Sequence, residues 1–179
     1  SWACGVNTFD CAAIYGGGEC ERILGQWLRA RAHPRDDVVI ITKGGCHGQD
    51  KLWTADLRAE SIRASLLSSL ERLGVSSVDC YMLHRDDGTT PVEEVVATMD
   101  ALQREGLFTV WGVSNWDHTR LCEAIEVARS TGSAPPRCDS RQVSLAEPTR
   151  PVWPNTTYMS HALASWYADN GVAVLAWEC

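Results

Sequence analysis

Short apolar runs alternate with amphipathic helical stretches along the whole of this sequence, and no other feature constrains the fold as much. The helical stretches place apolar residues three and four positions apart, as Ile62, Leu66 and Leu70 show. Strict alternation of strand and helix implies a parallel sheet of the α/β class. The six expected strands span residues 6–10, 38–43, 78–84, 110–113, 140–143 and 172–177.

Six strand–helix units favour an incomplete barrel over an open sheet. A closed (β/α)8 barrel has eight units and usually more than about 200 residues, whereas this chain has 179. An open doubly wound sheet is expected to carry G-x-G-x-x-G after its first strand, and the glycines at 16–18 lack that spacing. We therefore expect a (β/α)8 TIM-barrel type with about six of its eight units. Residues 1–179 would form one such domain, without the first strand and the last units.

Local signals predict where several helices begin and end. Thr-Pro-Val-Glu at residues 90–93 is typical of a capping box with proline at the first helical position. Asp117 is expected to cap the next helix, which would end near Gly132. The last helix is expected over residues 158–170, after an irregular loop at 147–155.

Four ionisable side chains come at or just after the ends of the expected strands. Asp10 and Tyr15 follow the first strand. Lys43 ends the second strand and His84 ends the third, and in a barrel these ends meet at the face that carries the chemistry. A phenol has an unperturbed pKa of about 10, but a nearby ammonium lowers that pKa and a carboxylate holds the ammonium in place. The pattern predicts a site that protonates the oxyanion formed from a carbonyl.

Each of these residues taken alone also fits a structural role. Asp10 and Lys43 are compatible with a buried structural pair, and position 84 with a hydrogen-bonded core histidine. Ser114 and Asn115 are compatible with helix capping, and a chain with eight tryptophans has many core aromatics. The order of the motifs decides between these interpretations.

Several motifs, in this order, make the chain similar to the aldo-keto reductase family. They cover nearly the whole sequence, and each falls at the end of an expected strand or within the helix that follows. They are Asp10 to Gly16 with Glu19, Ile41-Thr42-Lys43, Ser69 to Gly74, Val78-Asp79 through Leu83-His84, and Gly112 to Asn115. The resemblance implies an NADPH-dependent enzyme that reduces aldehydes and ketones, built on a (β/α)8 barrel.

The resemblance also implies a role for each catalytic residue. Tyr15 would be the general acid that protonates the carbonyl oxygen, and Lys43 would lower its pKa. Asp10 would pair with Lys43, and His84 would orient the substrate carbonyl.

Cofactor contacts follow from the same resemblance. Ser114, Asn115 and Gln142 match positions that hydrogen-bond the nicotinamide carboxamide. Trp177 falls where the family places an aromatic ring that stacks on the nicotinamide, and Asp10 is included among the cofactor contacts.

Two departures from the family pattern bear on the site. Cys11 stands where the family usually has threonine, and Arg85-Asp86-Asp87 follows His84 where some members have an aromatic residue, which suggests a more polar substrate entrance. The family's loop for the cofactor phosphates follows the seventh strand, a region that would lie beyond Cys179.

Composition limits the classes of partner that this chain is expected to bind. The net charge of −7 argues against a general nucleic-acid surface, and no apolar run is long enough to span a membrane. The eight cysteines form no C-x-x-C pair, so we expect reduced thiols in a cytoplasmic protein, and Cys46-His47 lacks further ligands for a metal. The expected partner is a small-molecule carbonyl substrate.

Two alternatives stay open at this point. The family also includes channel-associated subunits that hold the cofactor and turn over slowly, so a regulatory or binding role is the second hypothesis. An inactive fragment is the third, because an unclosed sheet has two unpaired edges.

Overall fold

The centre of the computed structural model is a parallel sheet of six strands, within the described residues 2–31, 34–46, 54–146, 148–150, 153–154 and 156–178. Each strand pairs with the next one along the chain, so the first and the last strands form the edges of the sheet. The strands are β1 (Thr8–Asp10), β2 (Val39–Gly44), β3 (Val78–Leu83), β4 (Phe108–Ser114), β5 (Cys138–Gln142) and β6 (Ala173–Trp177).

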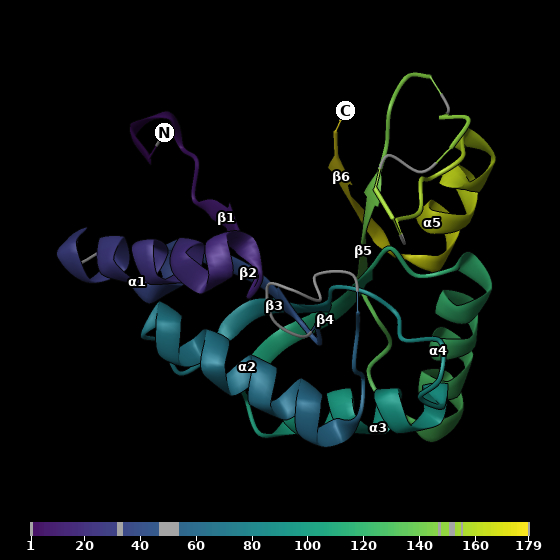
Figure 1. The fold of residues 1–179 in the computed structure, drawn as a ribbon, viewed down its shortest axis with the longest axis horizontal. Helices are drawn as coiled ribbons and strands as arrows, with labels where there is room; N and C mark the ends of the chain where they lie inside the picture. The colour runs from purple at the N-terminus through teal and green to yellow at the C-terminus, as the bar shows by residue number, and fades with distance from the viewer. Residues whose placement is uncertain are drawn as a thin grey trace.

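Helices follow the strands and lie along the outer side of the curved sheet (Figure 1). The result is a six-stranded half-barrel, which confirms the expected α/β fold of the barrel type. None of the described helices is long and apolar enough to cross a membrane. The α-helices are α1 (Glu19–Arg31), α2 (Ala59–Leu73), α3 (Val92–Arg104), α4 (His118–Thr131) and α5 (Ala164–Asn170), and the 3-10 turns are η1 (Trp2–Cys4), η2 (Tyr15–Gly18), η3 (Arg35–Asp37) and η5 (His161–Leu163).

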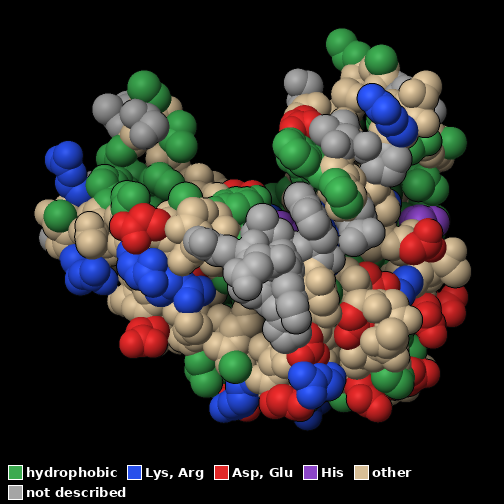
Figure 2. Space-filling view, viewed as in Figure 1, with side chains coloured by type: hydrophobic (Ala, Val, Ile, Leu, Met, Phe, Trp, Pro, Cys, Tyr) green, Lys and Arg blue, Asp and Glu red, His purple; other side chains and the backbone are tan. Residues whose placement is uncertain are grey.

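The two faces of the sheet have different partners because side chains alternate along a strand. On the outer face, residues such as Ile40, Tyr81 and Trp111 join the main hydrophobic core with the helices. On the inner face, a smaller cluster centres on Ile41 and Met82. The molecule is hollowed between its amino-terminal and carboxy-terminal parts, and many charged side chains lie on the outer helices (Figure 2).

The predicted helix ends are partly confirmed. The Asp117 carboxylate accepts a hydrogen bond from the backbone N–H of Thr119 at 2.8 Å, and Gly132 ends α4 in the left-handed conformation. The prediction of a capping box at residues 90–93 was wrong, because the Thr90 hydroxyl donates a hydrogen bond to the Asp87 carboxylate at 2.6 Å instead of capping α3. A carboxylate three residues upstream therefore takes the hydroxyl that the pattern assigned to the helix.

The last helix is shorter than predicted. Residues 161–163 form the turn η5, and the α-helix itself covers only Ala164–Asn170. Its buried residue is Tyr167, whose hydroxyl donates to the buried Asp139 carboxylate of β5 at 2.7 Å. Asp139 also pairs with the buried Arg141, so this end of the sheet is fastened to α5 through a buried charge.

We predict that Tyr167→Phe lowers the free energy of unfolding by about 1–3 kcal/mol, because a buried carboxylate oxygen loses a donor. Urea unfolding of the wild type and the variant measures the difference. Tyr158→Phe is the matched control, since Tyr158 is exposed. Equal losses in the two variants would contradict a special role for the Tyr167 hydroxyl.

Candidate active site

The four predicted catalytic residues come together at one end of the sheet. Asp10 ends β1, Lys43 lies next to the end of β2, and His84 directly follows β3. Tyr15 begins η2, the turn that leads from β1 to α1. All four line one pocket of about 430 Å³ at the carboxyl ends of the strands, because parallel strands bring these ends to the same edge of the sheet.

Lys43 is the centre of the hydrogen bonding in this pocket. Its ammonium donates to Asp10 Oδ1 at 2.5 Å, to the backbone carbonyl of Cys11 at 3.2 Å and to Tyr15 Oη at 3.4 Å. The side chain of Lys43 is only 2% exposed. A buried ammonium is costly unless it is paired and hydrogen-bonded, and these three acceptors match its three N–H groups.

Tyr15 is far more open than the lysine it contacts. The residue is 38% exposed, and its ring centroid lies 5.1 Å from the Lys43 ammonium. The phenol oxygen accepts a hydrogen bond from Lys43, so its own O–H has to point in another direction. A ligand that enters the pocket can therefore reach the O–H group of Tyr15.

His84 faces Tyr15 edge-on, with the two ring centroids 5.8 Å apart. Burial, together with the positive charges of Lys43 and Arg85, lowers the pKa of His84 to about 3. The imidazole is therefore neutral near pH 7 and carries one N–H donor. Its Nδ1 is buried and has no hydrogen-bond partner in the part of the chain that the structure describes.

We predict that His84 makes the folded state less stable as the pH falls. The folded pKa of about 3 lies below the ordinary value of 6.5. Between these values the unfolded chain binds a proton that the folded chain does not, so the free energy of unfolding rises with pH by at most about 1.4 kcal/mol per pH unit from this group. Urea unfolding across this range measures the slope. His84→Gln should flatten it, and parallel curves for the two proteins would contradict the burial of a neutral imidazole.

Two of the predicted cofactor residues lie at the end of β4: Ser114 is its last residue and Asn115 directly follows it. Asn115 Nδ2 donates to Ser114 Oγ at 2.8 Å, and Ser114 Oγ donates to the Ser140 carbonyl at 3.0 Å. Asn115 Oδ1 accepts from the backbone N–H of Thr157 at 3.2 Å. Asn115 has a φ of 60°, which is uncommon outside glycine and is concentrated at functional sites. Both residues line the pocket with a rigid amide and hydroxyl.

Of the remaining two predicted cofactor residues, one lines the pocket and the other does not. Trp177 ends β6 and lines the same pocket. Gln142 ends β5 opposite Trp177 in the strand register, but it is buried and does not line this pocket. The structure thus brings seven of the eight predicted site residues together and leaves Gln142 outside.

Four further residues line the pocket that sequence reasoning did not assign to the site: Ile14, Ser140, Trp153 and Thr156. Ser140 shares the alternating inward pattern of β5, so its position was a usable signal. Trp153 and Thr156 come from a loop without periodicity, and only the folded chain brings that loop to the pocket. Arg85, noted as a departure from the family, also lines it, and its guanidinium donates to the His84 carbonyl at 3.1 Å.

Metal ligands and disulfides do not contribute to the site within the described residues. No group of three His, Cys, Asp or Glu side chains is arranged there to hold a metal ion, and His47 falls outside those residues. The described cysteines are all free. Burial, together with the negative charge of Glu21, raises the pKa of the Cys11 thiol to about 11, so Cys11 stays a neutral thiol beside Tyr15.

A buried ammonium shared by a carboxylate and a phenol, at the carboxyl ends of parallel strands, is an arrangement suited to the acid–base chemistry of barrel proteins. Comparison with known proteins agrees with this class. The model of the aldo/keto reductase family matches residues 2–179, and the chain belongs to that family.

Two relatives describe the similarity in more detail. A probable voltage-gated potassium channel subunit beta from Oryza sativa subsp. japonica is 38% identical over 144 residues, which are 79% of this chain and 43% of that protein. The crystal structure of a thermostable aldo-keto reductase in complex with the inhibitor epalrestat superposes with a TM-score of 0.78 at 28% identity. That match covers 99% of this chain and 57% of the other, so the chain spans about half the length of the relatives it matches.

Proposed function

We propose that this protein reduces aldehydes or ketones to alcohols with NADPH as the hydride donor. The observation that carries the proposal is the buried Lys43 ammonium, which bonds both Asp10 and Tyr15 beside a neutral His84. The proposed substrate is a small carbonyl compound that enters from the open side of the pocket, and the proposed compartment is the cytoplasm.

Tyr15 is the proton donor in this proposal. Its exposed O–H protonates the carbonyl oxygen, and the Lys43 ammonium at 3.4 Å stabilises the phenolate that remains. Asp10 holds the ammonium between itself and the phenol. The whole exchange takes place where water is partly excluded, which strengthens each charge interaction.

His84 orients the substrate. A neutral imidazole donates one N–H to the carbonyl oxygen without adding a second positive charge beside Lys43. The substrate oxygen is then bonded from two sides, by the phenol and by the imidazole, and the carbonyl carbon is fixed in one orientation.

The pocket fits the nicotinamide end of the cofactor. NADPH, when bound, supplies the hydride that adds to the carbonyl carbon. The Ser114 hydroxyl and the Asn115 amide are suited to the polar carboxamide, and Trp177 supplies an aromatic wall for the ring. Asp10 also lines this pocket, whereas the proposed Gln142 contact would have to be made outside it.

We predict that Tyr15→Phe lowers kcat/KM for carbonyl reduction by about 10²- to 10⁴-fold, because the transition state loses its general acid. The assay follows NADPH absorbance with an aryl aldehyde as substrate. Tyr158→Phe is the control, since Tyr158 does not line the pocket. A Tyr15→Phe variant that keeps the wild-type rate would overturn the role of Tyr15.

A second candidate function is that of a cofactor-holding subunit that assembles with another protein. The 38% identity to a probable potassium channel beta subunit favours it. Both functions share the cofactor pocket, so the comparison of binding with turnover separates them.

We predict saturable quenching of tryptophan fluorescence by NADPH at micromolar concentration, with a smaller amplitude in Trp177→Leu. The physical reason is that Trp177 lies in the wall of the pocket. Quenching together with carbonyl-dependent oxidation of NADPH supports the reductase. Quenching without any turnover favours the subunit role, and the absence of quenching contradicts cofactor binding by this chain.

A further inference from the structure

A buried carboxylate that the proposed mechanism does not use lies behind the active site. Glu21, in the first turn of α1, is fully buried. Its Oε1 accepts a hydrogen bond from the Thr42 hydroxyl at 2.5 Å, and its Oε2 accepts one from Arg72 Nε at 2.6 Å. A charge buried this deeply is retained only when it is paired and hydrogen-bonded, so the position of Glu21 is fixed by both partners.

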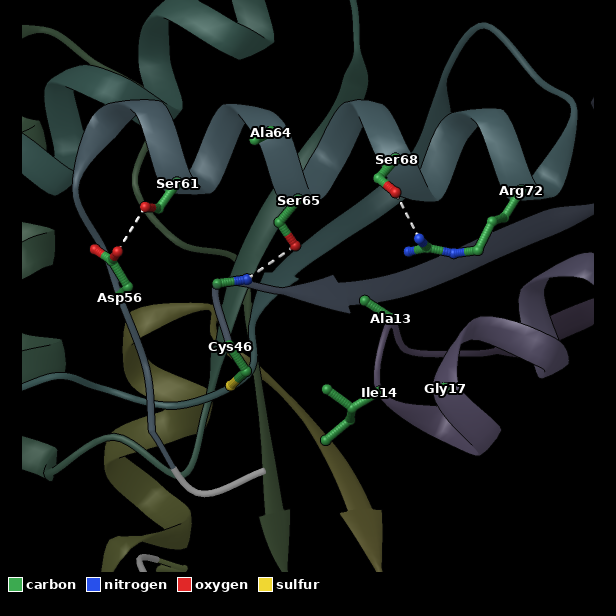
Figure 3. A pocket seen from close by; sticks show the side chains of 11 residues that line it. Ala13, Ile14, Gly17, Cys46, Asp56, Ser61, Ala64, Ser65, Ser68 and Arg72 are labelled. Atoms are coloured by element: carbon green, nitrogen blue, oxygen red, sulfur yellow. Dashed lines mark hydrogen bonds between the residues drawn. The ribbon is translucent and has the colours of Figure 1, made fainter. Parts of the chain in front are cut away.

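Arg72, in the last turn of α2, is held just as firmly. Besides Glu21, its guanidinium donates to Ser68 Oγ at 2.6 Å and to Ser69 Oγ at 3.1 Å. Figure 3 shows Arg72 and Ser68 along the cavity of about 490 Å³ between α2 and η2. Each nitrogen of the guanidinium therefore has an acceptor, and the side chain has one orientation.

Glu21 and Arg72 each contact the chain near one member of the Lys43–Tyr15 hydrogen bond. Thr42 directly precedes Lys43 on β2. Gly18 ends the turn that Tyr15 begins, and a Cβ at position 18 would lie 2.7 Å from Arg72 Cδ. The Arg72 side chain is thus packed against the backbone of the turn, while Glu21 bonds the strand.

The turn that carries Tyr15 needs such an external support. Its glycines at 16, 17 and 18 all have positive φ values, of 57°, 65° and 87°. Glycine is the residue type with the most backbone freedom, so tertiary contacts have to fix the turn. The hydrogen bond between Lys43 Nζ and Tyr15 Oη depends on the position of this turn. At 3.4 Å it is long for a hydrogen bond, so a small shift of the turn would break it.

We infer that the Glu21–Arg72 ion pair positions Tyr15 against Lys43. Thr42 and Lys43 point to opposite faces of β2, so the ion pair lies on the helix side of the sheet and does not reach the substrate. Glu21 and Arg72 are positioning residues, and their effect on turnover rests on the proposed reductase function.

Glu21→Gln tests this inference, because it keeps an oxygen that Thr42 can bond and removes the charge that Arg72 needs. We expect kcat to fall by about ten- to hundred-fold, the scale of a small misplacement of a reacting group, with KM nearly unchanged. The alkaline limb of the kcat profile should move to higher pH, because Tyr15 loses its close ammonium. A purely structural role would lower thermal stability and leave the pH profile in place.

The chain offers a matched control on the same helix. Arg63 of α2 forms a bidentate salt bridge with Glu105 on the exposed surface, and both N–O distances are 2.7 Å. Glu105→Gln removes a comparable ion pair away from the pocket and should leave the pH profile unchanged. Arg72→Lys, which keeps the charge but loses the serine bonds, should give an intermediate shift and provides a second variant if Glu21→Gln does not fold.

A measurement without turnover separates this inference from the proposed function. The ionisation of Tyr15 is followed by ultraviolet absorbance, as the difference between each protein and the same protein with Tyr15→Phe. A shift to higher pH in Glu21→Gln and not in Glu105→Gln supports the positioning role, even if the wild type reduces no carbonyl. Identical titrations in the wild type and in the variants of Glu21 and Arg72 would overturn it.

Discussion

The burial of one ammonium group governs the site and much of the architecture around it. Lys43 is 2% exposed at its side chain and is stabilised only because Asp10, the Cys11 carbonyl and Tyr15 converge on it. A charge in this position cannot be left unpaired without a large cost. The strand ends that supply these partners must therefore stay in register. The chemistry of the pocket and the packing around Lys43 depend on the same contacts.

Two further ion pairs extend this arrangement to the outer face of the sheet. Glu21 and Arg72 link α1, β2 and α2 behind the lysine. Asp139 and Arg141 occupy the corresponding face of β5 under α5. Both pairs lie between strands and helices. We interpret them as the parts of the fold that fix orientation, because hydrogen-bonded charges tolerate fewer arrangements than apolar side chains.

The sequence predicted the order and type of the elements well, because their apolar periodicity is strong. The end of α4 at Gly132 and its cap at Asp117 also follow from local chemistry. The capping box at residues 90–93 failed because Asp87 competes for the Thr90 hydroxyl, and such competition depends on geometry that a four-residue pattern does not contain. The last helix was overextended because helical periodicity continues through the turn at His161–Leu163.

The sequence alone determined which side chains the strand ends deliver, since a parallel strand places its last residues at a known edge. It did not determine how they meet: the 3.4 Å contact of Lys43 with Tyr15, or the exclusion of Gln142 from the pocket. The tertiary structure also decided that Glu21 is buried, through a partner 51 residues away. A charged residue on an amphipathic helix has the same sequence pattern whether it meets water or an arginine, and only the packed chain distinguishes the two.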